Sequence, residues 1–210
     1  MTVITIRGTL GSGATPIGRL VADRIHGDYV DREIIAQVAQ RLRLEQEQVV
    51  AKEEPPSGIW ARIAHALERS MAYGSAFDGV YAPVWEVPLD DANYLSTLRS
   101  VITELAQHPS IVIKGRGSQF ILKGHPAAFH VLVVRPPEFR LQRVMEQMKL
   151  GREAAKREMD RYDSSRRTFT KQYFGADRED PIHYDLTIST ERLSFEAADQ
   201  LIVQGAALKQ

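Results

Sequence analysis

The chain has 210 residues, of which 43% are hydrophobic, and its 27 Lys or Arg residues balance 27 Asp or Glu. This length and composition predict one globular domain with room for a small inserted lobe. Balanced charge gives no reason to expect binding to nucleic acid or to a membrane. Cysteine is absent, which excludes disulfides, thiolate catalysis and cysteine-ligated metal.

The apolar segments are short. None approaches the roughly 18 residues that a membrane-spanning helix requires. The first residues lack the basic, apolar and small-residue order of a signal peptide, because Met1 leads directly into a predicted strand. We therefore expect a cytoplasmic protein.

A glycine-rich loop near the N-terminus joins a predicted strand, residues 3–6, to a predicted helix. Its sequence follows the phosphate-binding pattern G-x-x-x-x-G-K-[ST], except that Ala14 replaces the lysine. Glycines let backbone N–H groups approach a phosphate, and the helix N-terminus adds partial positive charge. We expect Thr15 to be the N-cap of the helix and Pro16 its first residue. The predicted nucleotide-binding residues are Gly8, Thr9, Leu10, Gly11, Ser12, Gly13, Ala14 and Thr15.

The same loop offers a second interpretation. Gly11-x-Gly13, with Asp31 at the end of the next strand, is also typical of a dinucleotide fingerprint, in which an acidic residue binds the ribose. That fingerprint needs a third small residue at position 16, where this chain has Pro16. The fit therefore favours the phosphate-binding loop.

The rest of the chain alternates predicted strands with predicted helices, which indicates an α/β fold with a parallel sheet and helices on both faces. Ligands of such sheets bind beyond the carboxyl ends of the strands, where Gly8, Asp31, Arg116 and Arg135 fall. The further strands are expected at 29–30, 111–114, 129–134 and 185–189, and the helices at 15–25, 34–42, 59–73, 95–106, 137–148, 152–174 and 194–203.

Basic residues outnumber acidic ones between positions 135 and 171, and for most of them we expect a solvated helix face. Arg166 differs, because it continues an apolar helical stripe and should point inward. It either pairs with Asp163 one turn earlier or faces a phosphate pocket. The stripe comprises Ala155, Met159, Tyr162, Phe169 and Tyr173.

Several motifs, in this order and spacing, resemble the cytidylate kinase-like family of P-loop phosphotransferases. They are Gly-Ser-Gly at 11–13 followed by Ile-Gly-Arg at 17–19, Tyr-Val-Asp-Arg-Glu-Ile at 29–34, Val-Ile-Lys-Gly-Arg-Gly at 112–117, Asp-Ser-Ser-Arg at 163–166 and Tyr-Asp-Leu-Thr-Ile at 184–188. The resemblance implies a P-loop NTPase-type three-layer sandwich with a five-stranded sheet in a single domain, 1–210. Within it, an acceptor-binding lobe is expected at about 43–94 and an arginine-rich lid at about 149–176.

The activity that the resemblance implies is transfer of the ATP γ-phosphoryl group, with Mg²⁺, to a nucleoside monophosphate, with CMP or dCMP as leading acceptor. Its partners would be these small nucleotides. Residues matching the family's motifs would bind the acceptor (Asp31, Arg116 and Asp163), contact the transferring phosphate (Arg166, with Arg167) and place a hydroxyl beside Mg²⁺ (Thr15). Met159 replaces an arginine of the family's lid motif, which bears on selectivity for cytosine. Gly117 replaces the Asp that usually follows the Gly-Arg pair at 115–116.

The missing lysine affects the expected chemistry, because phosphoryl transfer depends on neutralising charge on the β- and γ-phosphates. Arg19 lies four residues after Thr15 on the same helical face and leans toward the loop, so it is a candidate substitute, as are Arg7, Arg166 and Arg167. A catalytically weak nucleotide-binding or regulatory module is the alternative.

Overall fold

The computed structural model describes residues 1–31 and 92–209. The chain divides into two compact units, one formed by Met1–Tyr29 with Pro109–Gln210 and the other by Val30–His108. The helices predicted at 34–42 and 59–73, and most of the predicted acceptor lobe, lie outside the described residues. In the second unit the structure describes α4 (Ala92–Leu105), close to the helix predicted at 95–106.

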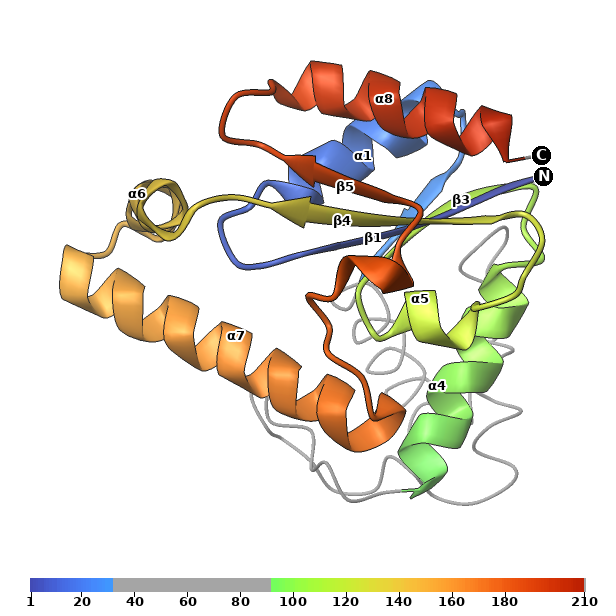
Figure 1. The fold of residues 1–210 in the computed structure, drawn as a ribbon, viewed down its shortest axis with the longest axis horizontal. Coiled ribbons are helices and arrows are strands. Elements are labelled where there is room, and N and C mark those ends of the chain that lie inside the picture. The colour runs from blue at the N-terminus through green and yellow to red at the C-terminus, as the bar shows by residue number, and fades with distance from the viewer. Residues whose placement is uncertain (32–91, 210) are drawn as a thin grey trace, which may run out of the picture. The chain divides into compact units, whose positions relative to one another are not determined.

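A five-stranded sheet forms the centre of the first unit, with the strand order β2-β3-β1-β4-β5 (Figure 1). β1 pairs in parallel with β3 and with β4, so that Ile4 lies opposite both Val112 and Phe129, and β4 pairs in parallel with β5. The predicted α/β class is therefore confirmed. The strands are β1 (Thr2–Gly8), β2 (Asp28–Val30), β3 (Ser110–Lys114), β4 (Ala128–Val134) and β5 (Leu186–Ser189).

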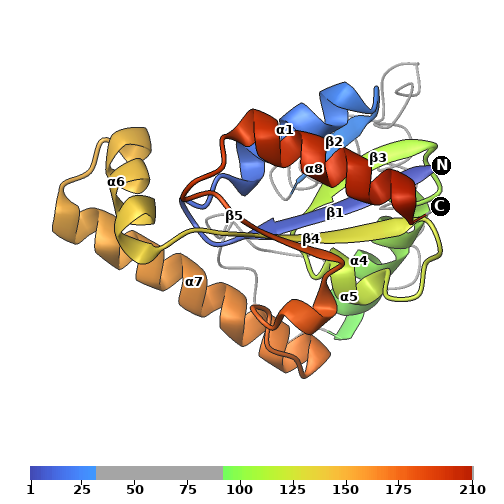
Figure 2. The ribbon, with the colours of Figure 1, turned by 45° about the horizontal axis from the view of Figure 1, so that its top comes forward.

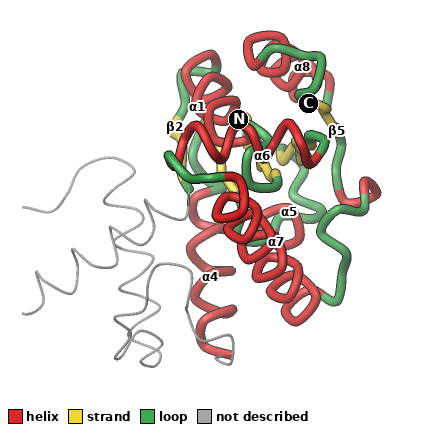
Figure 3. The backbone as a smooth tube through the Cα atoms, turned by 90° about the vertical axis from the view of Figure 1, so that its left-hand side faces the viewer, coloured by secondary structure: helices red, strands yellow, loops and turns green. Residues whose placement is uncertain are grey.

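Helices cover both faces of this sheet. α1 (Ala14–Arg24) and α8 (Phe195–Leu208) lie side by side on one face, and the short α5 (Ser118–Ile121), which the sequence did not predict, lies on the other (Figure 2). α6 (Pro137–Met148) and α7 (Arg152–Phe174) match the predicted ranges and pack together beyond the loop end of β1 (Figures 1 and 3). No helix among the described residues is both long and apolar enough to cross a membrane.

The main core lies between the sheet and the α1/α8 layer. Ile4 and Ile6 of β1 are fully buried in one cluster with Ile17 of α1 and Ile202 of α8. Side chains alternate between faces along a strand, so the intervening residues of β1 face the opposite side of the sheet. The core thus holds rigidly the strand and the helix between which the glycine loop lies.

A second, smaller cluster joins α6 to α7 through Leu141, Val144, Ala155 and Met159, all buried. The last two belong to the stripe predicted for α7, and their burial confirms its N-terminal half. Leu10, Met145 and Leu150 are partly buried against it, so this cluster reaches the glycine loop but is smaller than the main core.

The predicted N-cap of α1 is wrong. Gly13 caps the helix in the left-handed conformation, with φ +94°, and Thr15 and Pro16 lie within its first turn. A side chain at position 13 would be strained at this φ, and its Cβ would lie 2.5 Å from the ring of Phe195. Pro16 is tolerated because the first N–H groups of a helix have no intrahelical partner.

Candidate functional site

The glycine loop follows β1 directly and ends at the N-terminus of α1. Gly11 and Gly13 have positive φ values of +81° and +94°, which other residues adopt only with strain. Ser12 donates its N–H to the Thr9 carbonyl at 3.1 Å, and Thr190 donates its hydroxyl to the Ser12 carbonyl at 2.7 Å. The loop therefore has the compact, anchored geometry of an anion-binding turn.

Ala14, in the place of the lysine, is 4% exposed and belongs to the main core. A Cβ added to Gly8 would come within 2.7 Å of the Ala14 methyl group. Ala14 therefore packs into the core and carries no charge, so in this chain the cation at the loop comes from another residue.

α6 brings arginines to the loop that the sequence analysis did not select for the site. Arg140 donates to the Leu10 carbonyl at 3.2 Å. One nitrogen of Arg143 lies 3.1 Å from the point where a Cβ on Gly13 would be, and its guanidinium covers the Phe195 ring at 4.4 Å. The sequence signal was Arg-x-x-Arg near the start of a helix, five residues after Arg135, which itself follows a buried strand.

Positive charge around Arg143 is only partly compensated by acidic side chains among the described residues. Burial lowers the pKa of Arg143, the nearby charge of Arg135 lowers it further, and Glu146 opposes both. Arg143 Nη1 and Arg135 Nε are buried without a hydrogen-bond partner, and no described residue forms an ion pair with either side chain. Arginine stays protonated in proteins, so this arrangement favours a bound anion beside the loop.

Among the described residues, the predicted catalytic arginines form no hydrogen bond or ion pair with the glycine loop. Arg19 is exposed, with its guanidinium 5.1 Å from the centre of the Tyr29 ring. Arg166 is half-buried over the Tyr162 ring, at 5.0 Å, and Arg167 is exposed. Their roles remain predictions.

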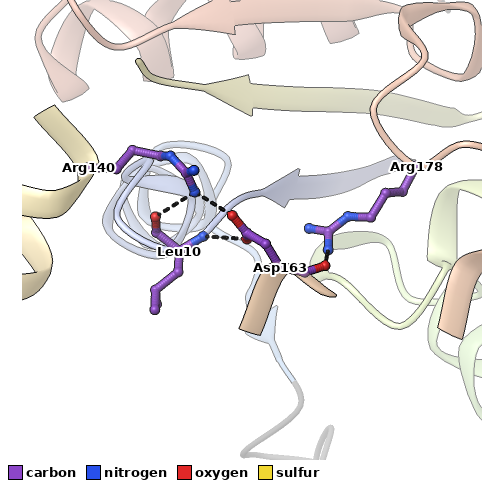
Figure 4. A network of polar contacts seen from close by, with 4 residues as sticks. All are labelled: Leu10, Arg140, Asp163 and Arg178. Carbon is purple, nitrogen blue, oxygen red and sulfur yellow. Dashed lines mark hydrogen bonds and ion pairs between the residues drawn. The ribbon is translucent and has the colours of Figure 1, made fainter. Parts of the chain in front are cut away.

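Asp163 on α7 contacts the glycine loop itself (Figure 4). Its carboxylate accepts from the Leu10 N–H at 3.4 Å and pairs with Arg140 at 2.7 Å. The alternative in which Arg166 pairs with Asp163 is therefore wrong, because α6 places Arg140 closer than the next turn of α7 places Arg166. The predicted acceptor contact of Asp163 is not tested by these contacts.

The remaining predicted site residues lie at strand ends or at the helix start. Asp31 is buried and directly follows β2, Arg116 follows β3 with φ +60°, and Thr15 is half-buried in the first turn of α1. Their roles in acceptor and Mg²⁺ binding remain predictions. Within residues 1–31 and 92–209, His, Asp and Glu form no cluster able to hold a metal without a ligand's help.

A sequence model described as the cytidylate kinase-like family matches residues 3–192. The chain belongs to the cytidylate kinase-like family. No curated protein matches the sequence. A solved structure of an uncharacterized protein from Eubacterium ventriosum is similar in fold, with 17% identity, 99% of each chain covered and a TM-score of 0.67.

Weaker likenesses include shikimate kinase from Acinetobacter baumannii in complex with shikimate, with 16% identity and a TM-score of 0.48 over 100% of this chain and 95% of that one. A gluconokinase from Sinorhizobium meliloti has 12% identity and a TM-score of 0.47 over 99% and 90%. Membership of the cytidylate kinase-like family supports phosphoryl transfer in general terms.

Proposed function

We propose that this protein transfers the γ-phosphoryl group of ATP to a nucleoside monophosphate, with CMP or dCMP as the leading acceptor. The observation that carries the proposal is the glycine loop with Arg143 beside it. Neither Arg143 nor Arg135, whose charge acts on Arg143, has a counterion among the described residues. A polyphosphate is the ligand that best compensates such a site, because it accepts from backbone N–H groups and neutralises both cations.

The residues present fit an ATP–Mg²⁺ complex, since buried donors at the loop still lack acceptors. The loop's N–H groups would hold the phosphates, and the Thr15 hydroxyl would lie on the Mg²⁺ side. Arg143, with Arg135, would supply the charge that lysine provides in the usual pattern. Mg²⁺, when bound, neutralises charge on the β- and γ-oxygens.

On the acceptor side we assign Arg116 to the phosphate of the monophosphate and Asp163 to its nucleoside. Asp31 would be a further polar residue of the acceptor site. An acceptor phosphate oxygen attacks the γ-phosphorus while the bond to the β-γ bridging oxygen breaks, which releases ADP. Arg166, with Arg167, would stabilise the transferring group from the lid helix α7. Arg19 stays a further candidate for the charge that the missing lysine would supply.

A steady-state assay with MgATP and a panel of ribo- and deoxyribonucleoside monophosphates tests the proposal. We expect turnover with at least one acceptor, highest with CMP or dCMP. The matched control is Gly13→Val, which should abolish nucleotide binding because position 13 requires a positive φ beside Phe195. Measurable ATP binding without turnover of any acceptor would contradict the proposal.

That result would favour the second candidate, a nucleotide-binding or regulatory module with little catalytic activity. Ala14, Met159 and Gly117 motivate it, because each departs from the residue that the usual kinase pattern has at that position. Ala14→Lys separates the two. If Arg143 already supplies the charge, the added lysine gains little activity; if the position is a defect, activity rises.

A further inference from the structure

We propose that the carboxylate of Asp163 and the phosphates of the bound nucleotide compete for the same donors, the Leu10 N–H and the Arg140 guanidinium. In this structure the carboxylate holds both, at 3.4 Å and 2.7 Å (Figure 4). The side chains of Arg140 and Asp163 are 12% and 13% exposed, so water screens their attraction only partly.

Leu10 lies within the glycine loop, between Gly8 and Gly11, where N–H groups precede a helix N-terminus and attract anions. A carboxylate accepting from such an N–H imitates a phosphate oxygen. Arg140 holds the carboxylate in this position, because its guanidinium donates both to the Leu10 carbonyl and to the Asp163 carboxylate. Polyphosphate and carboxylate cannot both occupy this position.

Asp163 is also held through its main chain. Arg178, 1% exposed, donates to the Asp163 carbonyl at 3.1 Å, and Arg7, 8% exposed, donates to the Arg178 carbonyl at 2.9 Å. Arg7 is the residue before Gly8, so this chain of contacts starts and ends at the glycine loop. The backbone of residue 163 therefore stays tethered when its side chain leaves the loop.

The consequence is an order of binding, and it rests on the proposed function. Nucleotide binding releases the Asp163 carboxylate while Arg178 keeps residue 163 nearby. Only then is the carboxylate available to an acceptor nucleoside. ATP should bind first, and the acceptor's affinity should rise when nucleotide is present.

Calorimetric titration of a non-hydrolysable ATP analogue with Mg²⁺ into wild type, Asp163→Asn and Asp160→Asn tests the competition. Asp160 is exposed on the same helix, so its variant makes the same charge change away from the loop. We expect Asp163→Asn to bind the analogue about tenfold more tightly than wild type. Asp160→Asn should match wild type, and adenosine, which lacks phosphates, should show no difference among the three.

Equal or weaker analogue binding by Asp163→Asn, with wild type still binding, overturns the competition and leaves the proposed function standing. Absence of analogue binding in every protein overturns both. A measurement on wild type guards against an unstable variant: the ¹³C signal of the Asp163 carboxyl group should move when the ATP analogue is added. An unmoved signal at saturating analogue also overturns the inference.

Discussion

The two sides of the glycine loop are built differently. On the α1/α8 side, fully buried residues such as Ile6 and Ile17 hold the loop through a continuous apolar core. On the α6/α7 side, the loop is held by the small buried cluster that joins these two helices and by the polar contacts of Arg140 and Asp163. Burial in a continuous core is expensive to undo, whereas a polar contact can be exchanged for a phosphate. The first side therefore supports the loop, and the second can respond to a ligand.

The largest expected effect tests this difference directly. Ile6→Ala should lower the free energy of unfolding by about 2–5 kcal/mol, because it leaves a cavity in the main core. Leu141→Ala, in the small α6/α7 cluster, should cost less, since its surroundings can collapse more easily. Urea unfolding monitored by circular dichroism measures both. Equal losses would show that the two sides are equally rigid.

The second-largest expected effect is a loss of folding stability in acid, which we attribute to His130 on β4. Burial lowers the pKa of His130 on β4 to about 4, although Asp185 opposes the shift, and Thr5 lies 2.8 Å from its Nδ1. Between about pH 6.5 and 4 the unfolded chain binds the extra proton, so stability falls as pH falls, by at most about 3 kcal/mol. His130→Gln should flatten unfolding free energies measured between pH 7 and 4. An unchanged pH slope would exclude His130 as its cause.

Removing the charge of Arg143, which α6 places beside the loop, should affect nucleotide affinity more than folding stability. Arg143→Met should weaken affinity for the MgATP analogue at least tenfold, about 1.5–3 kcal/mol, because a charged hydrogen bond to phosphate is lost. Thermal stability without nucleotide should not fall, since repulsion from Arg135 is relieved. Arg157→Met, exposed on α7, is the control. Unchanged affinity in Arg143→Met would exclude Arg143 as the substitute for lysine.

The smallest expected change in stability is that of breaking an ion pair on the exposed surface of α7. Arg161 pairs with Glu158 at 2.7 Å, and their side chains are 47% and 26% exposed. Glu158→Gln should change stability by less than about 0.5 kcal/mol and leave nucleotide affinity unchanged. A larger change in affinity would mean that contacts along α7, beyond Asp163, also control the loop.

The sequence by itself determined most of the secondary structure and the family. Alternating apolar strands and amphipathic helices predict the α/β fold from local periodicity, and Gly11 and Gly13 mark the loop because their backbone conformations exclude other residues. The glycine cap of α1 was missed because Phe195, 182 residues later, leaves no room for a side chain at position 13.

Only the tertiary structure decided which charges surround the loop. In the sequence Arg140 and Arg143 look like members of a solvated basic segment, and Asp163 is expected at the acceptor. The packing of α6 and α7 beyond β1 brings Arg140 and Asp163 to Leu10, and Arg143 to Gly13. Periodicity predicts which face of a helix is apolar, but the contacts of Arg140 and Asp163 with Leu10 join residues more than a hundred positions apart. Electrostatic energy follows distance in space, and for these residues that distance is set by packing.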